Sequence, residues 1–167
     1  MSVAANVNLS RVYYYSGNYG RAIEQCSRVL AKETRSSVAY FFLASALAQQ
    51  SLLAEAASAI ESIGPPADYA RIVSFRGYLY GLRGRLQDAQ TALRQLDELS
   101  TCKHISSYDR SLVYLGLKDS GRAMKFLERA YEEGDPALSY LAVDPKWGGP
   151  RPSSRFHALL EKIGLPR

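Results

Sequence analysis

The sequence predicts an all-α protein built from stacked helix pairs, and three observations support this fold class. A short pattern that ends in alanine returns at intervals of 34, 33 and 34 residues, at Ala22, Ala56, Ala89 and Ala123. The apolar residues around these alanines follow the spacing of one helix face. The second copy ends at Gly64-Pro65-Pro66, where proline cannot donate the next backbone hydrogen bond. A regular period of this length is typical of an array of paired helices.

The first two repeats are expected at about residues 3–36 and 37–66. In the first repeat we expect a second helix from about Tyr19 to Leu30, because Ala22, Cys26 and Val29 share one helix face. In the second repeat, the aromatic, leucine, small-residue and final slots of the first helix hold Tyr40, Leu43, Ala44 and Leu47.

The third and fourth repeats, at about 70–103 and 104–136, are less regular in their first helices. Gly77 and Ser111 occupy the small-residue slot, where two helices can approach closely only if a bulky side chain is absent. Arg76 and Arg110 stand in the leucine slot. The second helices are strongly patterned, with Leu93, Leu96 and Leu99 in one and Ala123, Leu127, Ala130 and Tyr131 in the other.

The tail at 137–167 is expected to be a loop followed by a capping helix. Pro136–Val143 is compatible with a short helix, and Asp144–Pro152 has the composition of turns. Ser153 or Ser154 can cap a last helix that runs to about Ile163. This helix would cover the apolar end of the array. Trp147 lies in the loop, and the sequence leaves open whether it folds back onto the last helices or anchors a partner.

The charge and cysteine content exclude several classes of protein. The net charge of +5 is spread along the chain, with no run of five like charges, so we expect no nucleic-acid face. Cys26 and Cys102 are too few for a disulfide scaffold, and Cys26 is expected to be a core thiol. Cys102 and His104 alone are two ligands short of a zinc site, so we expect no metal and no cofactor.

The chain shows no targeting or membrane signal. It has no apolar run of 18 residues, and its start, Met1–Leu9, lacks a basic flank and a continuous apolar stretch. We therefore expect a cytoplasmic protein with no membrane contact.

The turn-and-alanine motif in all four copies, together with the first-helix slots of two, resembles the tetratricopeptide repeat family over about residues 3–135. The resemblance implies a right-handed superhelical solenoid of antiparallel helix pairs in one domain over 1–167. It also implies a concave groove, lined by the first helices, that binds a peptide or a helix. One branch of the family clamps acidic C-termini with Lys, Asn and Arg on the first helices. The corresponding slots here fail that pattern, since they hold Val7, Arg11, Phe42, Arg71 and Phe75.

The residues expected to face this groove are mainly aromatic, with two arginines and a serine. Aromatic and arginine side chains dominate binding energy at interfaces. The sequence leaves open which of these aromatics pack between neighbouring repeats, because a rotation by one residue exchanges Phe41 with Phe42. The predicted groove comprises Arg11, Tyr14, Tyr15, Phe41, Phe42, Ser45, Arg71, Phe75, Tyr78 and Tyr108.

The tail shows a second, narrower resemblance. Tyr131–Pro136, Tyr140–Pro145 and Ile163–Pro166 resemble the end of a repeat module found at the C-terminus of bacterial signalling and transcriptional-regulator proteins. The resemblance implies a regulatory role in bacterial signalling. Because Met1 lies almost directly before the first helix, both a stand-alone module and a piece of a longer chain remain open.

No nucleotide-binding, metalloprotease or nucleophile-elbow motif occurs in the sequence, so we expect no enzymatic activity. The main hypothesis is a protein–protein interaction scaffold that binds a protein or peptide ligand in the aromatic groove. One alternative is a self-associating structural module that forms homo-oligomers. Another is a non-catalytic subunit that positions a partner enzyme.

Overall fold

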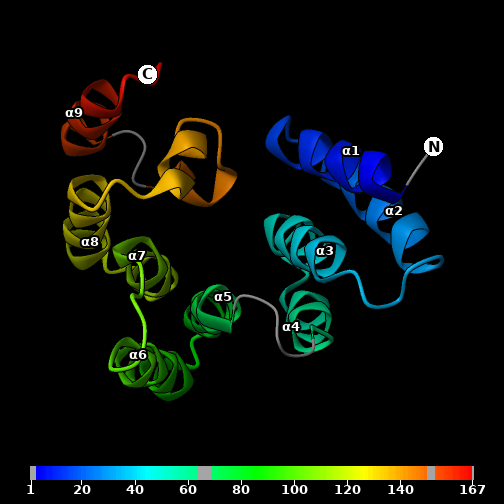
Figure 1. Ribbon diagram of the computed structural model, residues 1–167, viewed down its shortest axis with the longest axis horizontal. Helices are drawn as coiled ribbons and strands as arrows, with labels where there is room; N and C mark the ends of the chain where they lie inside the picture. Colours follow the sequence, from blue (N-terminus) through cyan, green and yellow to red (C-terminus); the bar gives the residue numbers. More distant parts are fainter. Residues whose placement is uncertain (1–2, 64–68, 150–152, 167) are drawn as a thin grey trace. The chain divides into compact units, whose positions relative to one another are not determined.

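The computed structural model describes residues 3–63, 69–149 and 153–166, with side chains from Ala5 onward. Within these ranges every regular element is helical, so the all-α class is confirmed. The helix stop expected at 64–66 lies outside the described residues. The α-helices are α1 Val3–Tyr15, α2 Tyr19–Leu30, α3 Ser37–Gln49, α4 Leu53–Glu61, α5 Tyr69–Leu82, α6 Leu86–Ser100, α7 Ser107–Gly116, α8 Ser120–Glu132 and α9 Ser154–Ile163 (Figure 1).

The chain divides into two compact units, Met1–Ile72 and Val73–Arg167, and the boundary falls within α5. We call them unit 1 and unit 2 and describe each by itself. The single domain that the resemblance implies over 1–167 stays a prediction.

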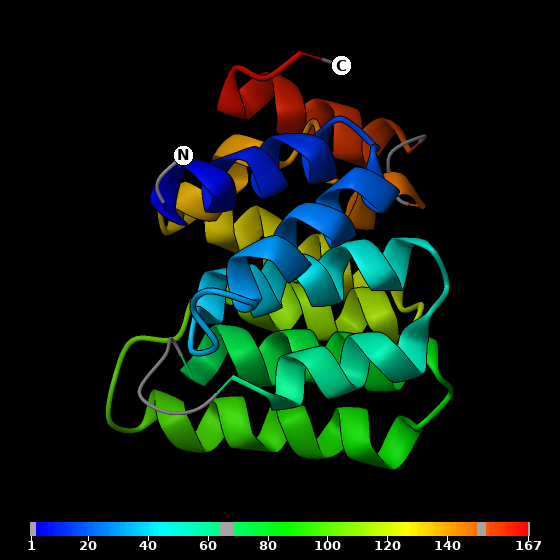
Figure 2. The same ribbon diagram turned by 90° about the vertical axis from the view of Figure 1, so that its right-hand side faces the viewer.

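In unit 1, α1 packs against α2 and α3, and α3 packs against α2 and α4 (Figure 1 and Figure 2). The buried cluster between α1, α2 and α3 contains Tyr14, Ala22, Cys26, Phe42 and Ala46. Cys26 is fully buried there, as expected for a core thiol. Small side chains at Ala22 and Ala46 leave room for the two aromatic rings beside them.

The repeated alanines explain the period of the sequence. Ala22, Ala56, Ala89 and Ala123 are all 0% exposed, although they lie near the starts of four different helices. Each follows the turn of its repeat, where the second helix packs closely. A larger side chain at such a buried position would overpack the contact.

The four turns inside the repeats share one backbone conformation. The residues at Gly17, Ser51, Gly84 and Lys118 all have positive φ, between 58° and 77°. After each of them, a backbone N–H donates to the carbonyl five residues earlier at 2.9–3.0 Å, as from Asn18 to Tyr13. This hydrogen bond closes a Schellman motif, which satisfies carbonyls at the end of the first helix. The turns therefore repeat with the same period as the alanines.

In unit 2, α7 packs against α6 and α8, and α9 packs against α8. The core of this end contains Leu127 of α8, Trp147, and Phe156, Leu159 and Leu160 of α9. The last helix starts as predicted, because the Ser153 hydroxyl accepts a hydrogen bond from the Phe156 N–H at 3.2 Å. An exposed pair, in which Arg155 holds Glu128 with two hydrogen bonds of 2.6 and 2.7 Å, joins α9 to α8.

The segment between α8 and α9 differs from the short helix considered at Pro136–Val143. It forms two 3-10 helices, η1 Pro136–Tyr140 and η2 Pro145–Gly148. Each begins after an aspartate, Asp135 or Asp144, whose carboxylate accepts a backbone N–H of the first turn. A proline at the first position favours such a start, and a second proline nine residues on breaks any longer helix.

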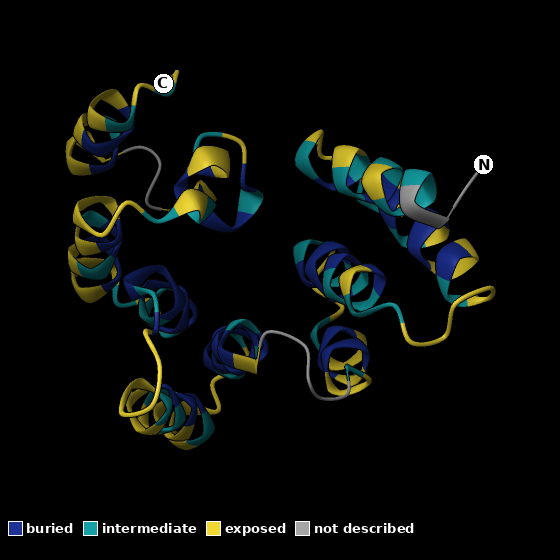
Figure 3. Cartoon of the chain, in the orientation of Figure 1, coloured by how far each residue is buried: buried dark blue, intermediate teal, exposed yellow. Residues whose placement is uncertain are grey.

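Burial follows the helix faces within each unit, as Figure 3 shows by its dark blue and yellow faces. Trp147 is 0% exposed, and its ring lies 6.1 Å from Tyr108 and 6.3 Å from Phe156 between centroids. The tryptophan therefore folds back onto the last helices of unit 2, which settles the alternative that the sequence left open.

Candidate partner-binding surfaces

Four aromatic rings of α1 and α3 pack against one another within unit 1. The Tyr14 ring centroid lies 5.1 Å from that of Tyr15 and 5.8 Å from that of Phe42. Phe42 also lies 6.2 Å from Tyr15 and 5.8 Å from Phe41. All four contacts are edge-to-face, the arrangement that the charge distribution of aromatic rings favours. We call Tyr14, Tyr15, Phe41 and Phe42 the aromatic face.

The members of the aromatic face differ in accessibility. Tyr14 is 1% exposed and Phe42 is 8% exposed, whereas Tyr15 and Phe41 are half-buried. Arg11 lies one helical turn before Tyr15 on the same side of α1, and it is also half-buried. Tyr14 and Phe42 thus form the buried part of the face, and Tyr15 and Phe41, with Arg11 beside them, form its accessible part.

The remaining predicted groove residues are mostly buried. Ser45 of α3 is buried, and its hydroxyl has no hydrogen-bond partner among the described residues. In unit 2, Phe75 and Tyr78 are buried with ring centroids 5.6 Å apart, and Tyr108 is buried beside Trp147. Arg71 is half-buried on α5.

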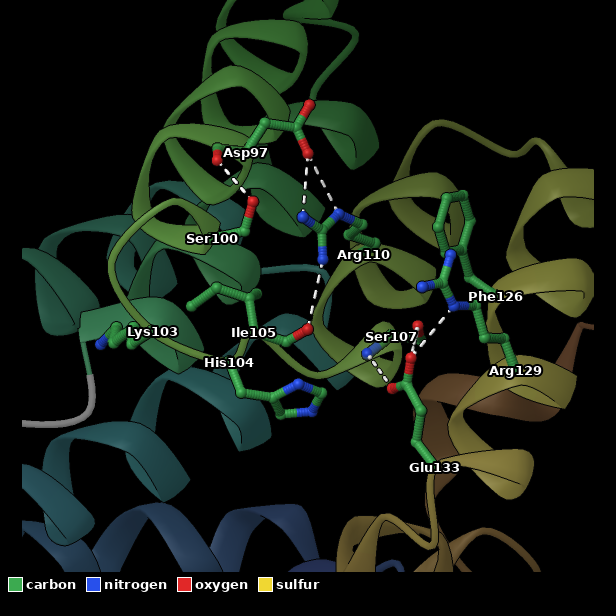
Figure 4. A pocket seen from close by; sticks show the side chains of 10 residues that line it. All are labelled: Asp97, Ser100, Lys103, His104, Ile105, Ser107, Arg110, Phe126, Arg129 and Glu133. Atoms are coloured by element: carbon green, nitrogen blue, oxygen red, sulfur yellow. Dashed lines mark hydrogen bonds and ion pairs between the residues drawn. The ribbon is translucent and has the colours of Figure 1, made fainter.

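Sequence reasoning did not identify an open pocket that lies entirely in unit 2. Its volume is about 420 Å³, and its walls come from the end of α6, the α6–α7 loop, the first turn of α7 and one side of α8 (Figure 4). We call it the α6–α8 pocket. Its charged or titratable lining residues are Asp97, Lys103, His104, Arg110, Arg129 and Glu133.

Glu133 fixes one side of the α6–α8 pocket. Its carboxylate accepts hydrogen bonds from the Ser107 N–H at 3.0 Å, the Ser107 hydroxyl at 2.8 Å and Arg129 Nε at 3.1 Å. Burial raises the pKa of Glu133, but the hydrogen bonds from Ser107 and Arg129 outweigh it and hold the pKa below its ordinary value. The carboxylate thereby joins the end of α8 to the start of α7.

Arg110 fixes the opposite side. Its Nε and Nη2 atoms donate to Asp97 Oδ1 at 3.1 and 3.0 Å, and Nη1 donates to the Ile105 carbonyl at 3.3 Å. Its side chain is only 16% exposed. Arg110 replaces leucine in the repeat pattern, and this departure is the sequence signal that could have indicated the site.

Within residues 3–63, 69–149 and 153–166, no group of three or more His, Cys, Asp or Glu side chains is placed to hold a metal ion. Over the same ranges, no helix combines the length and the apolar character needed to span a membrane.

Two comparisons with known proteins agree with this architecture. The family model described as tetratricopeptide repeat matches residues 7–70. A crystal structure of a tetratricopeptide repeat protein from Parabacteroides merdae ATCC 43184 has a TM-score of 0.52 at 14% identity; the match covers 97% of this chain. The chain spans 64% of the length of that protein, and at this identity the likeness concerns the fold. No curated protein matches the sequence.

The repeated helix pairs, their shared turns and their buried alanines define a helical-repeat protein. The family match over 7–70 supports the tetratricopeptide repeat resemblance seen in the sequence. Tetratricopeptide repeats generally mediate protein–protein interactions and generally carry no catalysis.

Proposed function

We propose that this protein is a non-enzymatic scaffold that binds a peptide or a helix of a partner protein on the first helices of its repeats. The observation that carries the proposal is the aromatic face of unit 1. Its two buried rings fix the positions of Tyr15 and Phe41, which remain partly accessible. Rigid aromatic side chains bury a large area on binding and lose little conformational entropy.

The chemistry of the face indicates what kind of segment fits it. Tyr15 and Phe41 offer apolar ring surface, and Arg11 offers guanidinium N–H groups one turn away. An apolar or aromatic side chain of the partner would pack on the rings, while Arg11 would bind a carboxylate or a backbone carbonyl. Arg71, which is half-buried, is the fourth residue that we propose as a contact to the partner, after Arg11, Tyr15 and Phe41. The six buried residues of the predicted groove contribute by packing inside the protein and not by contact with the partner. They are Tyr14, Phe42, Ser45, Phe75, Tyr78 and Tyr108.

The cellular role belongs to the same proposal. The tail segments Tyr131–Pro136, Tyr140–Pro145 and Ile163–Pro166 resemble the C-terminal module of bacterial signalling and transcriptional-regulator proteins. We therefore place the partner in a bacterial regulatory pathway in the cytoplasm.

A capture experiment tests the proposal. The wild-type protein and a Tyr15→Ala/Phe41→Ala variant would serve as bait in a native bacterial lysate, and mass spectrometry would identify retained proteins. Tyr14 and Tyr78 are left intact, because truncation of such buried rings costs about 3–5 kcal/mol and would unfold the bait. A matched control, Leu86→Ala/Tyr131→Ala, removes two exposed side chains on α6 and α8.

The scaffold proposal predicts a protein that the wild type and the control retain and the folded double variant loses. Equal retention by all three baits would refute the aromatic face as the binding surface.

Self-association is the second candidate function, because Val12 and Val38 leave apolar surface exposed on α1 and α3, at 59% and 52%. Sedimentation equilibrium distinguishes it through a mass that rises with concentration.

A further inference from the structure

The α6–α8 pocket holds more donor groups than its own acceptors use. Its lining has four basic side chains, Lys103, His104, Arg110 and Arg129, and two acidic ones, Asp97 and Glu133. Asp97 accepts from Arg110, and both oxygens of Glu133 accept from Ser107, with Arg129 sharing one of them. Among the described residues, three of the four carboxylate oxygens of the pocket accept a hydrogen bond, and Asp97 Oδ2 is the exception.

Three of the basic side chains keep donors that point to no acceptor. Among the described residues, no hydrogen bond is formed by the two terminal nitrogens of Arg129, by Lys103 Nζ or by the His104 ring. Figure 4 shows the His104 ring and both guanidinium groups around the pocket, while the Lys103 ammonium points away from them. A forked anionic oxygen group fits such a set, because a guanidinium donates two parallel hydrogen bonds to it.

The openness of the pocket indicates the size of the ligand. Lys103, His104 and Arg129 are exposed, so the walls cannot enclose a free small molecule as a typical ligand pocket does. Phe126 contributes an aromatic edge to the lining, and its ring is held by stacking on Tyr114 at 5.4 Å. An extended peptide that lies across the pocket can place an acidic side chain on Arg129 and its aliphatic stem on Phe126.

A nucleic acid suits the pocket less well than a peptide. Asp97 and Glu133 both reach its lining, and their charges would repel a continuous row of phosphates. The pocket is formed by helix ends and a loop of unit 2, and its lining contains no slot of the acidic-tail clamp and no member of the aromatic face.

We propose that the α6–α8 pocket is a binding site for an acidic peptide segment, whose carboxylate or phosphate oxygens are held by Arg129 with Lys103 and His104. The inference goes beyond the aromatic-face scaffold and does not depend on it. A peptide that carries either anionic group would meet the same donors, so the test separates the two sources.

The test is a fluorescence-anisotropy titration of the full chain with three labelled nonapeptides at low salt. One has two glutamates between glycines, one has two phosphoserines between glycines, and one has two glutamines between glycines. The variants are Arg129→Gln and Lys103→Gln/His104→Gln. Arg94→Gln is the matched control, because Arg94 is exposed on α6 outside the pocket and its side chain donates to Thr91. Circular dichroism would confirm that each variant is folded.

We expect the acidic or the phosphorylated peptide to bind, the neutral peptide not to bind, and the tighter of the first two to identify the anionic source. Each pocket variant should weaken binding by about tenfold, the value of one charge-assisted hydrogen bond, and Arg94→Gln should not. The Tyr15→Ala/Phe41→Ala variant should still bind, which separates this site from the scaffold proposal. Absence of binding, equal binding of the neutral peptide, or an equal loss in Arg94→Gln would overturn the inference.

Discussion

Gly81 of α5 and Gly116 of α7 lie in direct backbone contact within unit 2. A Cβ atom added to Gly81 would meet the carbonyl carbon of Gly116 at 2.4 Å, and one added to Gly116 would meet the Tyr78 carbonyl oxygen at 2.3 Å. Real Cβ atoms do not approach backbone atoms so closely. The two helices can therefore cross at this point only because both residues lack a side chain.

Replacement of Gly81 by alanine should destabilise unit 2. The added methyl group meets rigid backbone, so the helices must separate, and we expect the free energy of unfolding to fall by about 2–3 kcal/mol. Urea unfolding followed by circular dichroism measures this. Gly121→Ala is the control, because the nearest atom to its added Cβ is the Asp119 carboxylate at 3.6 Å. Equal stabilities of the two variants would show that the close contact is not required.

Lys118 is expected to lose strain when it becomes glycine. Its φ of 58° costs a residue with a side chain about 1–2 kcal/mol, more than the roughly 0.5–1 kcal/mol that glycine loses in chain entropy. Lys118→Gly should therefore raise the free energy of unfolding by about 0.5 kcal/mol. Lys125→Gly removes the same side chain from the interior of α8 and should lower it by about 1 kcal/mol. If both variants are destabilised alike, the turn at Lys118 is not strained.

The two cysteines should differ strongly in reactivity. Cys26 is 0% exposed and burial raises the pKa of its thiol, whereas Cys102 is exposed. A disulfide reagent should label Cys102 within seconds, and Cys26 should react only as the protein unfolds. The Cys102→Ser variant should lose the fast phase alone. A fast phase that persists in this variant would place Cys26 at the surface.

Glu133 should contribute to stability in a pH-dependent way. Its folded pKa lies below the ordinary value of 4.5, so its contribution is present above that value and is lost as the pH falls through the folded pKa. At neutral pH, Glu133→Gln should lower the free energy of unfolding by about 1 kcal/mol. Its loss of stability between about pH 5 and pH 3 should be shallower than that of the wild type. A profile for Glu133→Gln that matches that of the wild type would contradict the assigned hydrogen bonds.

The second helices of the repeats were predictable because their apolar residues form one stripe. The helix from Tyr19 to Leu30 has the bounds that the sequence indicated, and its buried residues include Ala22, Cys26 and Val29. Ser153 was one of two predicted caps and is the one used. In these segments local spacing and capping determine both the bounds of the helix and its rotation.

The first helices were less predictable because they are apolar on several sides. In α3, Tyr40 to Ala48 offers no polar stripe that fixes the rotation of the helix. Phe42 proved more buried than Phe41, a difference that depends on packing against α1 and not on local pattern. The α6–α8 pocket depends on contacts between residues 13 and 26 positions apart, such as Arg110 with Asp97 and Ser107 with Glu133. No local pattern encodes such contacts.

Site-specific photo-cross-linking tests the central claim, that the first helices of unit 1 bind a partner protein. A photoreactive phenylalanine analogue would replace Tyr15 in one strain and Tyr131, exposed on α8, in another. On irradiation of living cells, the account predicts a cross-linked product with one distinct partner at position 15 and none at position 131. Equal products at both positions, or none at position 15, would contradict it.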